Sequence, residues 1–216
     1  MDKETFLQNY IDIETKTFIR ADKTKRLDEF VNNTFNLSFN EIIEIIDYLT
    51  QNKITIRHQL FRRILYPILA TEIDKDNIQA IKSFIRLQEY YGNYQNLTED
   101  NRFSIWQLID RGLNIAPSDN ELLKLYQEKQ KSYFEYTLHE LPIGVLYGSN
   151  GASIEECKEL LNDLTRYEKV CGILAVDDKE LIDECKFYYL AYKDYLTIYK
   201  NYKSFDDYLD KNQAEE

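Results

Sequence analysis

Five tyrosines near the C-terminus follow one another at the period of an α-helix. The steps between them are four, three, four and three residues, so a single helix would carry all five rings along one stripe: Tyr188, Tyr192, Tyr195, Tyr199 and Tyr202. A phenol can bury its ring while its hydroxyl keeps water or a hydrogen-bond partner. The stripe therefore fits two interpretations, and both stay open at this point. In one, the rings pack in the core with their hydroxyls at the solvent edge; in the other, they form a protein-binding surface.

Apolar residues recur at helical spacing through the rest of the chain as well. Only three prolines and six glycines interrupt the 216 residues, and the β-branched alternation typical of strands is confined to the short stretch 173–176. These patterns predict an all-α fold of nine or ten antiparallel helices. Two arrangements fit it, a helical-repeat-like array and an irregular bundle.

Local signals mark where some of these helices begin and bend. Ser38, Ser118 and Ser153 each precede a glutamate by three residues, the spacing of a capping box, and each predicts a helix start. Pro67 lies inside an apolar helical pattern, so we expect a bend or a break near it.

We expect one all-α domain spanning residues 1–216. Its weakest point of subdivision lies near 114–118, around Pro117, and residues 206–216 form an acidic C-terminal tail. The 44% hydrophobic content is typical of a folded chain, and the length suffices to bury a sizeable core.

One helix junction resembles a known repeat family. Residues 105–126 read IWQLIDRGLNIAPSDNELLKLY, with Gly112, Leu113 and Pro117 at positions that match the junction between two tetratricopeptide repeats. The resemblance covers about a tenth of the chain, no second copy follows about 34 residues away, and the Trp…Leu-Gly…Tyr signature is missing. It implies helical hairpins and a scaffold whose concave face binds a protein or peptide.

The net charge of −11 is concentrated in the C-terminal half of the chain. Residues 1–108 carry 14 Lys/Arg against 16 Asp/Glu, whereas residues 109–216 carry 13 against 22. Such a field repels nucleic acid and anionic membranes and attracts basic proteins, so we expect neither direct nucleic-acid binding nor membrane binding. A small basic cluster is the exception and could hold one anion, although a solvated helix face is the commoner reading: Lys53, Arg57, His58, Arg62 and Arg63.

The three cysteines point to a reducing compartment. Cys157, Cys171 and Cys185 are odd in number, 14 residues apart and without a CxxC pair, which predicts buried thiols rather than disulfides. Polar residues interrupt the N-terminal stretch 1–13, so it does not look like a signal peptide. We therefore expect a cytoplasmic protein.

Groups for catalysis, metal binding or cofactor binding are few. The two histidines, His58 and His139, lie 81 residues apart and belong to no metal-binding spacing. No Walker or dinucleotide glycine motif occurs. We accordingly predict no catalytic residue, no metal ligand and no cofactor.

The segment 140–153 is the longest irregular connection that we expect. It holds three of the six glycines together with apolar side chains, among them Tyr147. Packing of this loop onto the helices and insertion into a partner both fit. Tyr147 joins the five stripe tyrosines as the sixth candidate partner-binding residue.

These observations lead to a non-catalytic helical protein that binds another, basic protein. An immunity or antitoxin protein that neutralises a basic toxin is a concrete version of this hypothesis. Two other hypotheses remain: a bundle that binds a small molecule or lipid in a pocket, and a homo-oligomeric structural protein whose tyrosine face pairs with itself.

Overall fold

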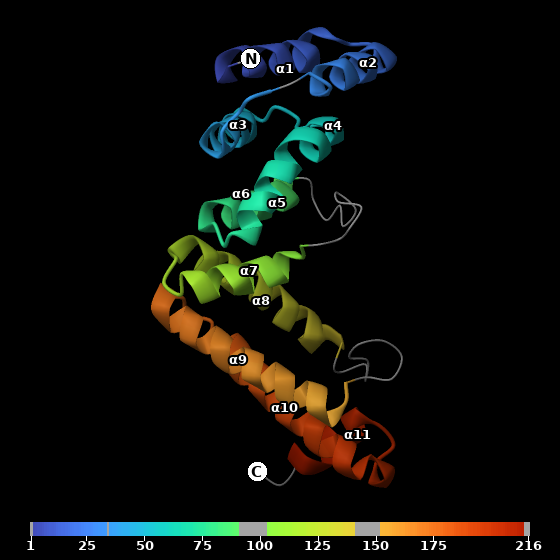
Figure 1. The fold of residues 1–216 in the computed structure, drawn as a ribbon. Coiled ribbons are helices and arrows are strands. Elements are labelled where there is room, and N and C mark those ends of the chain that lie inside the picture. The colour runs from blue at the N-terminus through green and yellow to red at the C-terminus, as the bar shows by residue number, and fades with distance from the viewer. Residues whose placement is uncertain (1, 34, 91–102, 141–151, 214–216) are drawn as a thin grey trace. The chain divides into compact units, whose positions relative to one another are not determined.

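The computed structural model describes residues 2–33, 35–90, 103–140 and 152–213 (Figure 1). Within these ranges the chain forms ten helices and no strand, when the contiguous segments α4, η1 and α5 are counted as one helix and η3 is counted with α10. The predicted all-α class is thereby confirmed. Across the same ranges, no helix is long and apolar enough to cross a membrane.

The chain divides into two compact units. Unit 1 is Met1–Ser118 and unit 2 is Asp119–Glu216, so the division falls directly after the range 114–118. Unit 1 carries 15 Lys/Arg against 17 Asp/Glu, and unit 2 carries 12 against 21. Almost the whole net negative charge thus belongs to unit 2.

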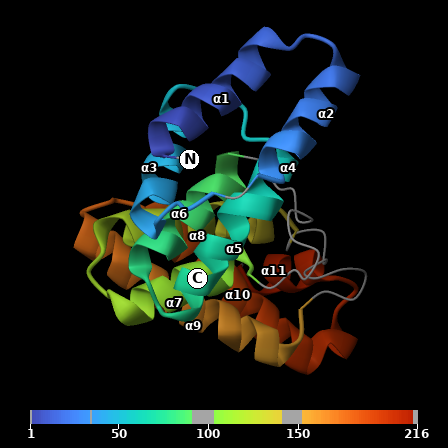
Figure 2. The ribbon, with the colours of Figure 1, turned by 45° about the horizontal axis from the view of Figure 1, so that its top comes forward.

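Unit 1 is built from short amphipathic helices. They are α1 (Lys3–Lys16), α2 (Arg20–Val31), α3 (Phe39–Gln51), α4 (His58–Leu60), η1 (Phe61–Leu65), α5 (Tyr66–Asp74), α6 (Ile78–Tyr90) and α7 (Ile105–Ile115). Helices α1 and α2 run antiparallel as a hairpin (Figure 2). Phe6 and Phe30 hold this hairpin together, with ring centroids 5.0 Å apart, and both rings are buried.

Pro67 changes the helix without ending it. The ring of a proline clashes with the carbonyl four residues earlier, and its nitrogen donates no hydrogen bond. The chain widens into the π-helical segment η1 just before the proline, where the Tyr66 amide donates to the Phe61 carbonyl, and then continues as α5. The predicted disturbance is therefore a π-turn within a continuous helical stretch.

Two residues of the predicted basic cluster of unit 1, Arg57 and Arg63, make internal hydrogen bonds. Arg57 donates from Nε and Nη2 to the Glu14 carboxylate, both at 2.9 Å, and Arg63 donates to the Asn32 side-chain oxygen at 2.6 Å. The Tyr10 hydroxyl lies beside them, donating to the Thr55 carbonyl at 2.7 Å and accepting from the Arg57 amide at 2.8 Å. These contacts tie the 55–57 segment to α1.

Unit 2 is a set of longer helices. They are α8 (Asn120–Glu140), α9 (Ile154–Leu174), α10 (Lys179–Ile198), η3 (Tyr199–Asn201) and α11 (Phe205–Gln213). Helices α9 and α10 lie side by side and antiparallel (Figure 1). Cys157, Cys171 and Cys185 are buried and free, as predicted, and burial raises the pKa of Cys157 and of Cys185 to about 11. These thiols are core side chains rather than nucleophiles.

Two of the three predicted capping boxes are confirmed. Ser38 caps α3 with Glu41, and Ser153 caps α9 with Glu156, in both directions of the motif. The prediction for Ser118 is wrong by one residue. Asp119 makes the cap of α8, and its carboxylate accepts from the amides of Glu121 and Leu122. Asp and Ser are comparable capping residues, so the backbone geometry decides between these two neighbours.

Candidate functional site

A surface groove in unit 2 lies between the C-terminal half of α8 and the N-terminal turns of α10. It is open to solvent, and most of the side chains that line it are charged. The lining residues are Lys131, Glu135, Leu138, His139, Asp177, Asp178, Lys179, Glu180, Leu181, Asp183 and Glu184. Six carboxylates therefore face two lysines, so the groove carries a strong negative field.

The local sequence explains why α10 begins with so many acids. Unpaired backbone amides give a helix N-terminus a partial positive charge, which favours carboxylates in the first turns. Glu180 lies in that first turn, and Glu184 follows one turn later on the same face. The acids are thus compatible with helix stability while leaving their charges in solvent.

Two residues that line the groove, Asp178 and Lys131, belong to a hydrogen-bond network that reaches into the core of unit 2. Asp178 is 9% exposed and accepts from the Tyr167 hydroxyl at 2.5 Å, from Gln127 Nε2 at 2.8 Å and from Lys131 Nζ at 2.6 Å. Gln127 also donates to the Tyr167 hydroxyl at 3.1 Å. The network joins α8, α9 and the start of α10, and so holds the groove walls in place.

Burial and hydrogen bonding shift the pKa of the Asp178 carboxyl in opposite directions. Burial, the largest single influence, raises the pKa of this carboxyl, but the hydrogen bonds from Lys131, Tyr167 and Gln127 together hold the pKa below its ordinary value. The hydrogen bond between Lys131 and Asp178 also raises the pKa of Lys131. Burial and the hydrogen bond to Asp178 also raise the pKa of Tyr167. The ion pair is therefore present at neutral pH.

The acidic groove continues along α10 into exposed apolar side chains. Phe187 is 45% exposed and Leu190 is 37% exposed, and the helical period places them on the same side of α10 as Asp183 and Glu184. Single exposed apolar residues are common on protein surfaces. Here, however, two of them border a row of carboxylates, which makes an amphipathic surface.

The predicted tyrosine stripe is partly covered by the chain itself. Helix α11 folds back so that the Phe205 ring packs against Tyr192, with centroids 5.0 Å apart, and against Tyr195, at 5.5 Å. Tyr208 of α11 lies 5.8 Å from Tyr195 and 5.1 Å from Tyr202. The structure thus brings three of the predicted tyrosines together around one internal seam.

The individual tyrosines differ in exposure. Tyr192 is buried because its ring packs against Phe205. Its assignment to a partner-binding surface is therefore corrected. Tyr188, Tyr195 and Tyr202 are half-buried, and Tyr199 is 50% exposed, so for these four partner binding stays a prediction. Tyr147 lies outside the described residues.

The sequence interpretation missed the groove acids, although one signal was available. Glu180, Asp183 and Glu184 recur at steps of three and one, which places them on one helix face. What the sequence could not indicate is that Glu135 of α8 lines the same hollow, since it is 45 residues from Glu180. In the described part of the chain no group of three or more His, Cys, Asp or Glu side chains is placed to hold a metal ion.

Comparison with known proteins assigns no family to this chain. No family model matches it, and no solved structure matches it. A curated phosphoglycerate mutase of Schizosaccharomyces pombe is 32% identical over 76 residues, which cover 33% of this chain and 36% of that protein. The chain therefore matches only about a third of the length of that relative.

Proposed function

We propose that this protein is a non-catalytic, cytoplasmic interaction module that binds a basic protein through the acidic groove of unit 2. The observation that supports this proposal is the ratio of six carboxylates to two lysines around the groove, one of which, Lys131, is already paired with Asp178. Complementary charge of this kind raises the rate of association and excludes acidic partners.

The exposed Phe187 and Leu190 define the partner further. A surface that combines carboxylates with apolar side chains fits a basic segment that also carries apolar residues, such as a cationic amphipathic helix. The apolar contacts supply affinity, and the charges supply selectivity and speed. A basic toxin, for instance a nuclease, that this protein neutralises as an immunity protein or antitoxin is the concrete case we favour.

The partial likeness to a phosphoglycerate mutase does not lead us to propose that activity. A phosphoglycerate carries phosphate and carboxylate charges, which the carboxylates of the groove repel. The matched segment also covers only 36% of that enzyme.

The test is affinity capture from cells of the source organism at about 50 mM and about 500 mM salt, since screening weakens charge complementarity at the higher concentration. The wild type should retain a basic protein at low salt and release it at high salt. The variant Glu180→Gln/Asp183→Asn/Glu184→Gln should lose that protein even at low salt.

A matched control separates the groove from overall charge. Glu159→Gln/Glu168→Gln/Asp210→Asn removes the same three charges from other exposed positions of unit 2 and should retain the partner. Tyr188→Ala/Tyr199→Ala tests the tyrosine stripe in parallel. Retention by the groove variant, or retention that ignores salt, would contradict the proposal, and loss only in the tyrosine variant would move the site to the stripe.

A further inference from the structure

The connection between α1 and α2 has an inverted burial pattern. Phe18 is 91% exposed and Ile19 is 65% exposed, whereas Thr17 between them and α1 is only 7% exposed. The buried Thr17 hydroxyl has no hydrogen-bond partner in the described structure. The chain therefore places a polar group in the interior and two large apolar groups in solvent.

This inversion is unfavourable for folding alone. Exposed apolar area and an unsatisfied buried hydroxyl both lower the stability of the folded state. Local departures of this kind are expected where a surface is kept for binding. The Phe18–Ile19 tip is therefore a candidate contact surface, and it belongs to unit 1, whereas the groove residues belong to unit 2.

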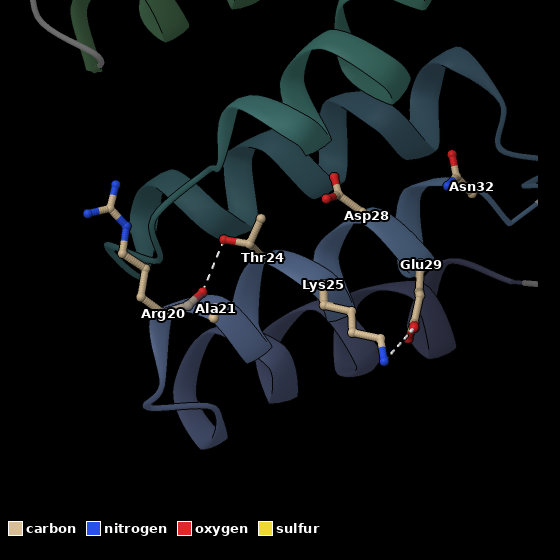
Figure 3. A pocket seen from close by; sticks show the side chains of 7 residues that line it. All are labelled: Arg20, Ala21, Thr24, Lys25, Asp28, Glu29 and Asn32. Carbon is tan, nitrogen blue, oxygen red and sulfur yellow. Dashed lines mark hydrogen bonds and ion pairs between the residues drawn. The ribbon is translucent and has the colours of Figure 1, made fainter.

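Basic residues precede and follow the tip in the sequence, although the chain as a whole is acidic. Residues 15–26 contain five Lys/Arg and one Asp, with Arg20 directly after the tip. Figure 3 shows Arg20 at one end of an exposed row on α2, extending away from the other side chains, while Lys25 further along pairs with Glu29 at 3.9 Å. Arg20 and Arg26 are both exposed.

Nearby acids neutralise three of these five cations, and two arginines remain. Glu14, whose side chain is 5% exposed, is shared by Lys23 and Arg57, so one carboxylate faces two cations there. Lys16 pairs with Asp12 at 2.8 Å. Acids thus match Lys16, Lys23 and Lys25, whereas the exposed Arg20 and Arg26 form no ion pair in the described part of the chain.

We infer that the Phe18–Ile19 tip and its cations bind an anionic lipid surface. Apolar side chains that protrude between basic residues can enter the boundary between headgroups and acyl chains while the cations meet lipid phosphates and carboxylates. The phosphates of a nucleic acid could contact the cations, and a base could stack on the Phe18 ring, but no part of a nucleic acid would bury the Ile19 side chain in an apolar environment. The net charge of −11 does not prevent binding of an anionic lipid surface at this tip. Screening limits the field of each charge to about 8 Å at physiological salt, so distant acids of the chain act weakly there.

Two apolar side chains and a few cations give reversible binding rather than permanent anchoring. Each cation near an anionic surface contributes about fivefold to the partition coefficient, and insertion of the apolar pair contributes roughly tenfold or more. The association should therefore respond to salt and to lipid composition.

The test is co-sedimentation of the full chain with vesicles of phosphatidylcholine alone and with vesicles in which phosphatidylserine makes up about 30% of the lipid. The wild type should bind the anionic vesicles at least about tenfold more tightly than the neutral ones. A Phe18→Trp reporter in a Trp106→Phe background should shift its emission to shorter wavelength on anionic vesicles only.

Two variants and two controls locate the surface. Phe18→Ser/Ile19→Ser should lower the affinity roughly tenfold, and Arg20→Gln/Arg26→Gln should lower it by about fivefold for each cation. Phe187→Ser/Leu190→Ser and Lys124→Gln/Lys169→Gln remove the same kinds of side chain from unit 2 and should leave vesicle binding unchanged. Circular dichroism spectra that match the wild type show that each variant is folded.

Three outcomes would overturn the inference. One is the absence of wild-type binding to anionic vesicles, and another is equal binding to both kinds of vesicle. The third is binding that survives Phe18→Ser/Ile19→Ser but is lost with Arg20→Gln/Arg26→Gln. That result would identify a general polyanion site, for nucleic acid or an acidic protein, in place of a lipid site.

Discussion

At the scale of single residues, Asp178 shows how a capping position can serve tertiary structure instead. It occupies the N-cap position of α10, yet its side chain makes no capping hydrogen bond. Its carboxylate accepts from Tyr167, Gln127 and Lys131, which come from two other helices. The neighbouring Asp177 accepts from the Lys179 amide at 3.3 Å and so supplies the local contact at the helix start.

Asp178→Asn should lower the free energy of unfolding at pH 7 by about 2 kcal/mol, the size of the contribution from hydrogen bonds to a buried charged group. The pKa of the Asp178 carboxyl is lowered in the folded state. Its contribution is therefore fully present above the unfolded-state pKa of about 3.9 and is lost as pH falls through the folded-state pKa. Urea unfolding followed by circular dichroism should show the difference between variant and wild type shrinking below about pH 4.

The control is Asp177→Asn, which removes an exposed neighbour and should change stability by less than about 0.5 kcal/mol. Equal stability of Asp178→Asn and the wild type at pH 7 would show that the network does not stabilise the fold.

At the scale of secondary-structure elements, α11 depends on one anchor. Phe205 is its one buried residue among those described, and its ring lies between Tyr192 and Tyr195. The side chains of residues 206–212 are exposed or half-buried. A nine-residue helix is marginal by itself in water, so its stability comes from this docking.

Phe205→Ala should release α11 while the longer helices of unit 2 stay folded. Hydrogen exchange followed by mass spectrometry should show the amides of 206–213 exchanging at least about tenfold faster, with those of α9 unchanged. Asp210→Ala, an exposed position on the same helix, should leave exchange as in the wild type. Faster exchange throughout α9 would instead mean that α11 is part of the cooperative core of unit 2.

At the scale of the whole molecule, the two units have separate polar networks. In unit 1 the Tyr10 hydroxyl donates a hydrogen bond to the Thr55 carbonyl and accepts one from the Arg57 amide. Unit 2 uses Asp178 with Tyr167, and each network lies entirely within its own unit. Each unit of about a hundred residues is large enough to unfold cooperatively.

Calorimetry of the full chain should resolve two unfolding transitions. Tyr10→Phe should lower the midpoint of one and Asp178→Asn that of the other, by about 4–8 °C for each kcal/mol lost. Each variant serves as the control for the other. A single transition that both variants shift would contradict independent unfolding of the units.

Much of the secondary structure was predictable because its signals are local. Ser38 and Ser153 reach their partners three residues away, so the spacing alone identifies the caps. The same logic failed between Ser118 and Asp119, where two capping residues are adjacent and only the backbone geometry chooses. The candidate groove was not predictable, since it combines side chains of α8 with those of α10.

The sequence by itself determined the all-α class, the burial of the cysteines and the helical placement of Tyr188, Tyr192 and Tyr195, because each follows from spacing within a few helical turns. The prediction that one helix carries all five tyrosines is wrong, since α10 ends at Ile198, before Tyr199 and Tyr202. Only the tertiary structure decided what covers Tyr192 and where the acids gather. Phe205 reaches Tyr192 through a reversal of the chain, and Asp178 meets Gln127 across 51 residues. Such contacts depend on loop closure and helix packing, which no local period specifies.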